Sequence, residues 1–354
     1  MALAVFLTVP VVAGPAAAQT AVAEASMHAL SIGDATLTEL VLPVGVTWRV
    51  AGVRLDANTA FASARYERDG VASSISGLTD LTLRVMIPMM EDRGRIIVAG
   101  NVPTGTAALS ADQIPVAGVI TTDLLTLPVR SFGTGAGVTT GFAVAQPLGG
   151  WVVGGVLVYR VGSAFEPVVG TAGTQAAEFR PGSELRLRLG VERPSLSGVT
   201  VRGAISWSRF ADDEADDQPL FSRGDRLMAQ VVTEFPFLRG AASVYAWNLY
   251  RSGSELMLDA TPQPTPSSNL LGAGAAVSHP LTPELTIRPR AELLVQTGEV
   301  GFGAGDGWIT RLGSAATYLL GPVRLEPAAL LQLGTLEGQA VFGLVLRGGV
   351  LWQR

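Results

Sequence analysis

Charged residues recur at every second position in several stretches of this chain. In the stretch 284–296, Arg288, Arg290 and Glu292 occupy even positions, and apolar residues stand between them. A spacing of two places side chains on one face of a strand, so these groups would share a polar face. Such a face could line an aqueous channel and set its field, or its charges could pair across strands and brace the wall. The residues predicted to line a pore are Arg54, Asp56, Arg84, Arg186, Arg188, Glu192, Arg202, Glu234, Arg288, Arg290, Glu292 and Arg311.

The sign of these charges bears on the solute. Arginines outnumber acidic residues in the predicted lining, so we expect a mild preference for anionic or neutral polar solutes. An apolar permeant would need an apolar path instead. The faces near Ala143, Ala145, Gly154 and Val156 could provide one.

Residues suited to catalysis or metal binding are scarce. The chain has two histidines, His28 and His279, no Cys, and no G-x-S-x-G, H-E-x-x-H or P-loop motif. Ser278 and His279 are neighbours on a strand and face opposite ways, so they do not form part of a triad. The acidic run 212–217 offers oxygen ligands suited to Ca²⁺, but its spacing is not that of an EF-hand. We expect no enzyme activity, cofactor or metal site.

The elements that would position the charged residues are β-strands. The alternation recurs in fifteen stretches of about 9–11 residues, the length of a tilted membrane-spanning strand. Single-chain bacterial barrels have even strand numbers, so one further strand at 22–31 predicts sixteen. Fourteen is the alternative, if 22–31 is a tail or plug and one stretch is spurious. The fifteen stretches are 39–49, 53–61, 80–88, 95–102, 138–146, 151–160, 184–192, 199–208, 226–235, 241–250, 270–278, 284–296, 308–318, 323–332 and 341–352.

The connections between these stretches alternate in length. Those near 50–52, 91–94, 147–150, 194–198, 238–240, 281–283 and 321–322 are short. Those near 68–77, 103–136, 162–182, 210–224, 252–268 and 297–307 are longer. Bacterial outer-membrane barrels have short periplasmic turns and long outer loops, so the alternation predicts this fold class: an all-β, antiparallel, up-and-down transmembrane barrel.

Aromatic residues lie near the ends of the same stretches. Trp151 and Tyr159 share one face, opposite the face that carries Arg160, and the pairs at 308 and 318 and at 342 and 352 repeat this. Eight to ten residues of a tilted strand rise roughly 20–26 Å, about the height of the apolar band between two aromatic girdles. The predicted girdle consists of Trp48, Trp151, Tyr159, Trp207, Trp308, Tyr318, Phe342 and Trp352.

Composition agrees with an exported membrane protein. The chain has 354 residues, 16% of them charged, and a net charge of −5 that gives no support to a nucleic-acid partner. An apolar run over residues 2–12 precedes Ala16-Ala17-Ala18, as in a secretory signal peptide, although no basic residue stands before the run. We expect a signal peptide at 1–18 and a barrel at 19–354, located in the bacterial outer membrane.

Four short motifs carry a family resemblance. Ser76-Gly-Leu-Thr-Asp-Leu-Thr-Leu83 is similar to an S-G-x-x-D-x-x-L strand, and Asn101-Val-Pro-Thr-Gly105 to a P-T-G strand end. Gly133-Thr-Gly135 before a strand and Tyr159-Arg-Val-Gly162 at the end of one are also similar. These motifs, over residues 76–162, resemble outer-membrane channels of the phenol-degradation-pathway type. The resemblance implies a barrel for small, including hydrophobic or aromatic, solutes. The last residue, Arg354, departs from the usual barrel ending, because an aromatic residue is common at the C-terminus of such barrels.

The segment 103–136 bears on whether such a channel is open. It contains apolar runs at 114–120 and 124–129, which are unfavourable in water, so it should fold into the lumen, over the mouth, or into a hairpin that extends the wall. The favoured function is passive diffusion of small solutes through a monomer or homotrimer. The alternative is a plugged barrel that displays loops for adhesion or envelope anchoring. Expected partners are outer-membrane lipid, lipopolysaccharide and the barrel assembly machinery.

Overall fold

The computed structural model describes residues 18–169, 177–194, 198–258, 261–298 and 305–353, so the predicted leader 1–18 lies outside the described residues except for Ala18. The described elements are β1 (Ala18–Ile32), β2 (Ala35–Val50), β3 (Val53–Arg68), β4 (Val71–Leu78), β5 (Leu81–Met89), β6 (Gly94–Val102), η1 (Ala111–Gln113), α1 (Ile114–Ile120), η2 (Asp123–Leu125), β7 (Gly137–Leu148), β8 (Trp151–Gly162), β9 (Phe179–Arg180), β10 (Glu184–Arg193), β11 (Thr200–Phe210), β12 (Asp213–Ala215), β13 (Gln218–Ser222), β14 (Arg226–Phe237), β15 (Gly240–Arg251), β16 (Ser254–Leu258), β17 (Thr261–Thr265), β18 (Ser268–Pro280), β19 (Leu285–Thr297), β20 (Gly307–Leu320), β21 (Val323–Leu336) and β22 (Gln339–Gln353).

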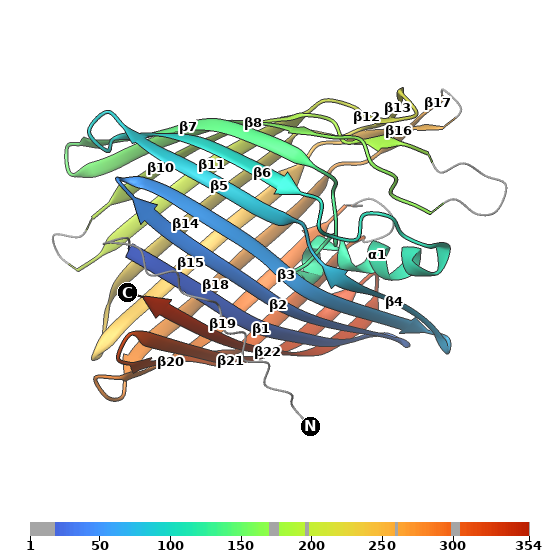
Figure 1. The fold of residues 1–354 in the computed structure, drawn as a ribbon. Helices are drawn as coiled ribbons and strands as arrows, with labels where there is room; N and C mark the ends of the chain where they lie inside the picture. The colour runs from blue at the N-terminus through green and yellow to red at the C-terminus, as the bar shows by residue number, and fades with distance from the viewer. Residues whose placement is uncertain (1–17, 170–176, 195–197, 259–260, 299–304, 354) are drawn as a thin grey trace.

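The main sheet closes on itself as a barrel (Figure 1). Successive strands of the wall pair antiparallel, and β1 pairs with β22 to complete the ring. Among the described residues the sheet contains 17 strands, but β4 and β5 both pair with β3 and share one position in the wall. The prediction of an all-β barrel of sixteen strands is confirmed, including the strand at 22–31, and the alternative of fourteen is wrong.

The two ends of the barrel differ in the length of their connections. At the end where β22 finishes, adjacent strands are joined by short turns such as 51–52, 149–150 and 321–322. The other end carries the long connections 103–136, 163–183 and 211–225. The expected longer connection near 68–77 is wrong: Asp69 and Gly70, both at positive φ, form a two-residue turn, and β4 continues the wall.

The wall has one apolar face and one mixed face. Leu157, Leu187 and Leu333 point outward and are exposed, at 49%, 38% and 45%, while Asp56 on the inner face is 4% exposed. Exposed leucines along a closed wall suit a hydrocarbon surrounding rather than water. Among the residues that the structure describes, no helix is both long and apolar enough to cross a membrane.

A second, smaller sheet stands above the end with long connections. It has the order β17-β16-β13-β12-β9, and three of the long connections supply its strands. Figure 1 shows it as an extension of one side of the wall. The acidic run lies here: Asp216 and Asp217, at positive φ, form the turn between β12 and β13.

Candidate functional site

The twelve residues predicted to line a pore share the inner face of the barrel. Cross-strand register joins them in rows: Asp56 lies opposite Arg84, Glu192 opposite Arg202, and Glu292 opposite Arg311. The same parity holds for Arg54, Arg186, Arg188, Glu234, Arg288 and Arg290. Inner placement follows from the period of two, but a role in conducting solute stays a prediction.

Asp56 is the centre of the first group of inner charges. Its carboxylate accepts hydrogen bonds from the Thr47 hydroxyl at 2.7 Å and from Arg54 Nε at 2.8 Å on one oxygen. Arg84 Nε donates to the other oxygen at 2.9 Å. The Asp56 side chain is 2% exposed, while the two arginines are 32% and 42% exposed. The group therefore braces β2, β3 and β5 and leaves its positive charge facing the lumen.

A second group lies on β6, β8, β10, β11 and β14. Arg202 forms ion pairs with Glu192 at 3.2 Å and Glu234 at 3.5 Å. Arg95 and Arg188 have no hydrogen bond or ion pair to any described residue. Small inner residues such as Gly154 lie between them, and together they border a hollow of about 560 Å³. This part of the wall combines an apolar floor with unpaired positive charge.

A third group connects the wall with the segment 103–136. Tyr245 and Glu292 flank Gly274 on neighbouring strands, and Glu292 pairs with Arg311 at 3.3 Å. Arg311 Nη2 then donates to the carbonyl oxygen of Leu125 in η2 at 3.0 Å. A row of polar groups thus runs from β15 across the wall to the loop. It holds the loop against strands that are far away in the sequence.

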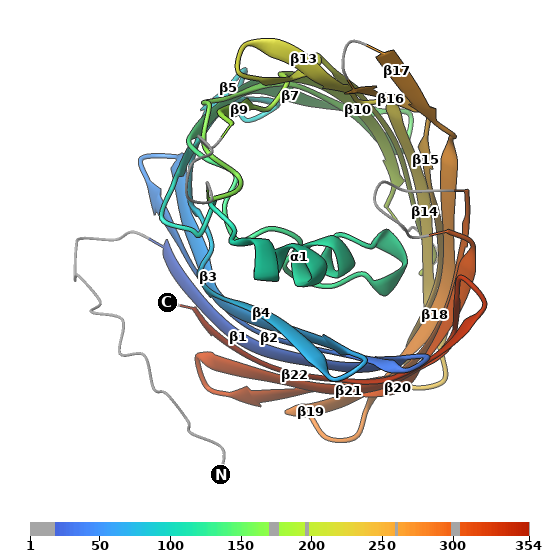
Figure 2. The same cartoon turned by 90° about the vertical axis from the view of Figure 1, so that its right-hand side faces the viewer.

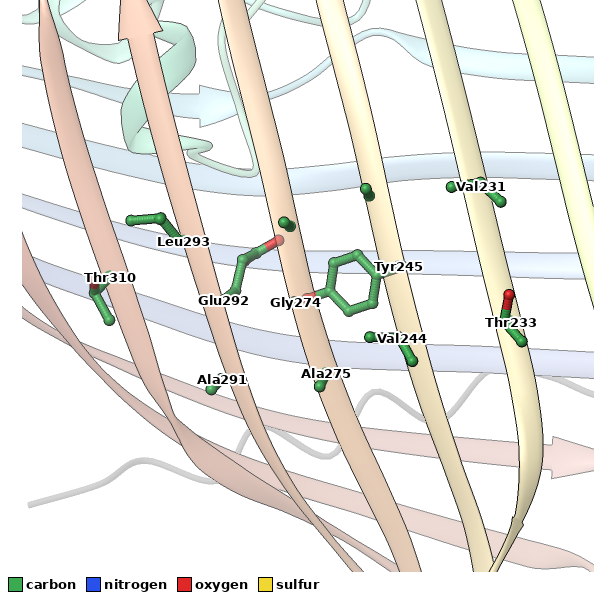
Figure 3. A pocket seen from close by; sticks show the side chains of 12 residues that line it. Val231, Thr233, Val244, Tyr245, Gly274, Ala275, Ala291, Glu292, Leu293 and Thr310 are labelled. Carbon is green, nitrogen blue, oxygen red and sulfur yellow. The ribbon is translucent and has the colours of Figure 1, made fainter.

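Gly274 makes this chain of contacts possible. It lies on β18 directly between Tyr245 of β15 and Glu292 of β19 (Figure 3). A Cβ at Gly274 would lie 2.5 Å from the Tyr245 hydroxyl oxygen and 2.7 Å from the Ala291 carbonyl oxygen. The absence of a side chain therefore lets the tyrosine ring cross β18, which is the way aromatic rings cover strand glycines in barrels.

The segment 103–136, which we call the plug loop, lies inside the barrel. Figure 2 looks along the barrel and shows α1 within the ring of strands. Of the locations left open by the sequence, the lumen is the one observed. The loop buries apolar side chains against inner-wall residues of β1–β4 and β18–β22, as a soluble core would. Its buried members are Val116, Ile120, Leu124, Leu125, Leu127, Val129 and Phe132.

Polar contacts fix both ends of the plug loop. Asp80, at the break between β4 and β5, accepts Thr134 N–H at 2.7 Å and Gly105 N–H at 3.1 Å. Ser73 of β4 donates to the carbonyl oxygen of Asp112 at 2.5 Å and accepts Val116 N–H at 3.3 Å. The loop therefore packs on the lumen face of β4, and the Gln113 side-chain amide donates to the carbonyl oxygen of Ser74 in this strand, which does not pair with β6.

Buried charges hold the loop on two sides of the lumen. Glu39 of β2 is fully buried and accepts Val129 N–H at 3.3 Å. Asp123, whose side chain is 2% exposed, forms ion pairs with Arg130 of the loop and Arg251 of β15. Because β2 and β15 stand far apart around the ring, the plug loop spans the lumen between them (Figure 2).

The sequence missed several of these residues. Alternation along the strands could have placed Glu39, Arg226 and Arg251 on the inner face. Glu39 has the parity of Thr47, which lies opposite Asp56, Arg226 has the parity of Glu234, and Arg251 lies opposite Arg226. No local signal could have identified Asp123. It stands in a segment without a period, and its partner Arg251 is 128 positions further along the chain.

The eight predicted girdle residues all lie on the outer face. Strand directions place Trp48, Trp151, Tyr318 and Trp352 near the end with short turns, and Tyr159, Trp207, Trp308 and Phe342 near the other end. Tyr159, Trp308 and Phe342 are 47%, 43% and 57% exposed. Two rings of aromatic residues around an apolar band are typical of barrels in lipid.

The acidic run 212–217 is used in contacts within the small sheet. Asp213 pairs with Arg223 at 2.7 Å and accepts Gly182 N–H at 2.7 Å. Arg180 pairs with Glu214 at 3.2 Å and Asp217 at 3.3 Å. Over the described ranges, no three His, Cys, Asp or Glu side chains are grouped so as to hold a metal ion.

Comparisons with known proteins identify the fold. No family model matches the chain, and no curated protein matches it in sequence. Its structure is similar to the outer membrane protein OprD from Pseudomonas aeruginosa, with a TM-score of 0.51 and 10% identity over 96% of this chain and 94% of that chain. It is also similar to a bacterial polysaccharide outer membrane secretin, with a TM-score of 0.53 and 11% identity over 95% and 98% of the two chains. The chain has the fold of bacterial outer-membrane β-barrels.

Proposed function

We propose that the protein is an outer-membrane channel for the passive diffusion of small solutes. The observation that carries the proposal is a closed ring of sixteen strands with a charged inner wall and an apolar outer wall. A barrel of about sixteen strands is wide enough to enclose water, whereas about eight strands fill their own interior. The plug loop would set the width of the path.

The outer face supports the location in the outer membrane. Lipid contact by the apolar band, with the aromatic rings at its two borders, follows from the physics of barrels in a bilayer. The long connections and the small sheet would face outward and the short turns inward, since bacterial barrels have short periplasmic turns. Contacts with lipopolysaccharide, recognition by the assembly machinery and a homotrimer remain predictions.

The inner wall bears on which kind of solute the channel would pass. Unpaired Arg95 and Arg188 border the hollow that contains Gly154 and Ala143. This surface would suit a small molecule with an apolar or aromatic body and one acidic group. The resemblance to channels of the phenol-degradation type points to the same kind of body.

Reconstitution in planar lipid bilayers tests the proposal. We expect steady single-channel conductance, raised when residues 106–133 are replaced by a short Gly-Ser linker that removes the plug loop. A chain without these residues that still conducts nothing at any potential would refute a channel. That result would leave the second candidate, a barrel closed by its loop that displays the small sheet to the surroundings. The buried apolar contacts of the plug loop are what favour that candidate.

A further inference from the structure

Two titratable side chains are buried beneath the plug loop on the inner wall. His28 of β1 lies directly opposite Glu39 of β2, and the two residues are 1% and 0% exposed. Their neighbours on the same face, Leu30, Leu37 and Val41, belong to the apolar cluster that the plug loop completes. Opposite residues on paired strands have Cβ atoms about 4.5–5.5 Å apart, so the two groups share one environment that is sealed from water.

Hydrogen bonds do not satisfy this buried pair. Neither ring nitrogen of His28 has a hydrogen-bond partner among the described residues, and Glu39 Oε2 has none either. Glu39 Oε1 accepts the backbone N–H of Val129 at 3.3 Å, and this bond ties the plug loop to β2. A buried ionic group without a partner is costly, so the docked loop requires that the pair carry no net charge.

The surroundings of the pair make a charge of either sign unfavourable. The charged or titratable groups on the elements packed around it are Arg347 of β22, Arg311 of β20, Tyr66 of β3, and Asp123 and Arg130 of the plug loop. Arg347 and Arg311 repel a positive charge on His28. Arg130 is bound to Asp123, and over the described part of the chain no cation pairs with Glu39. A positive charge on His28 alone, or a negative charge on Glu39 alone, would therefore weaken docking of the loop.

The contact between Glu39 and Val129 lies at the border of open space. Residues 128–131 of the plug loop line a hollow of about 740 Å³ together with residues of β1, β2 and β3. Ser26 and Val41, each two positions from one member of the pair on the same face, line this hollow too. Protons can therefore reach the pair from the lumen, and this part of the loop has room to leave β2.

We propose that His28 and Glu39 form a proton-controlled latch, which holds the plug loop in the lumen at intermediate pH and releases it in acid and in alkali. Lowering the pH places a positive charge on His28, and raising the pH leaves Glu39 as a carboxylate without a cation. Each change adds a net charge that the docked loop seals from water, so each destabilises docking. The latch concerns the position of the loop, which can be measured whether or not the barrel conducts.

A spin label on the plug loop tests the latch in the full-length protein in lipid vesicles. The chain has no Cys, so Thr121→Cys, at an exposed position directly after α1, provides a single site for the label. We expect an immobile label at pH ~7 and a mobile fraction that rises several-fold toward both pH ~5 and pH ~9, a range that brackets the ordinary titration of histidine.

Each side of this pH profile is assigned to one residue. Glu39→Gln keeps an oxygen for the Val129 N–H but cannot ionise, so the alkaline release should disappear and the acid release should remain. His28→Asn cannot gain a proton, so it should lose only the acid release. The matched controls are His279→Asn, at the other histidine, and Glu67→Gln, at an exposed carboxylate, and both should keep the wild-type profile.

The label distinguishes failure of the latch from failure of the channel. Constant mobility of the wild-type label between pH ~5 and pH ~9 would overturn the latch, whether or not either variant folds. Alkaline release that persists in Glu39→Gln, or acid release that persists in His28→Asn, would overturn it too, as would a release lost in either control. A label that follows the expected profile in a protein that never conducts, even after deletion of the plug loop, would leave the latch standing and remove the channel.

Discussion

Asp56 shows how one residue can hold several strands of this wall. Its buried carboxylate is bound by Thr47, Arg54 and Arg84, so removing its charge leaves two arginines facing each other with no anion between them. We expect Asp56→Asn to lower the free energy of unfolding by about 2–4 kcal/mol, because a buried pair is broken from one side. Glu67→Gln breaks an exposed pair with Arg65 and should cost about 0–1 kcal/mol. Urea unfolding in lipid vesicles measures both, and equal costs would show that burial of Asp56 is unimportant.

Gly274 is a second residue on which several contacts depend. Gly274→Ala would push the Tyr245 ring off β18 and away from Glu292 on the next strand. We expect a loss of about 1–3 kcal/mol from overpacking. The matched control is Gly348→Ala, because a Cβ at Gly348 would meet nothing within 4 Å. A drop in unfolding midpoint for the control as large as for Gly274→Ala would argue against this account.

At the scale of elements, the plug loop and β4 depend on each other. The loop supplies the partners of the Ser73 hydroxyl and a donor for the Ser74 carbonyl oxygen of β4, which does not pair with β6. When residues 106–133 are replaced by a Gly-Ser linker, we expect amide hydrogens of β4 to exchange with an opening free energy close to zero, as in a frayed terminus. Amides of β10, which lies away from these contacts, serve as the control. Full protection of the β4 amides in the shortened chain would show that the plug loop does not stabilise β4.

For the whole molecule, the sum of inner charges predicts selectivity. Arg95 and Arg188 lack acidic partners among the described residues, so the lumen should favour anions. Under a KCl gradient, the reversal potential should indicate anion preference at ~0.1 M and less of it at ~1 M, where the Debye length falls to about 3 Å. Arg188→Glu should shift the reversal potential toward cations, and Arg68→Glu, at the exposed end of β3, should not. Cation preference in the wild type would contradict this.

The sequence determined the parts of this protein that depend on local geometry. A period of two is set by the pleat of the strand, so residues such as Arg188 and Trp151 could be assigned to opposite faces before any contact was known. The recurrence of that period gave fifteen stretches, and the even strand number of single-chain barrels raised the prediction to sixteen. The break at Thr79 and Asp80 was not foreseen, because the polar stretch 68–77 looked like a connection and is instead mostly β4.

Only the tertiary structure decided what fills the lumen. The plug loop has no period, and its apolar runs fit the inside of the barrel, the mouth or a hairpin equally well until Leu124 and Leu125 are seen buried against β19 and β20. The pairing of Asp123 with Arg251, and the unpaired Arg226 beside it, join segments that no local rule connects. Contacts across a lumen depend on which strands face each other after the ring has closed, and that is a property of the closed barrel rather than of any stretch of sequence.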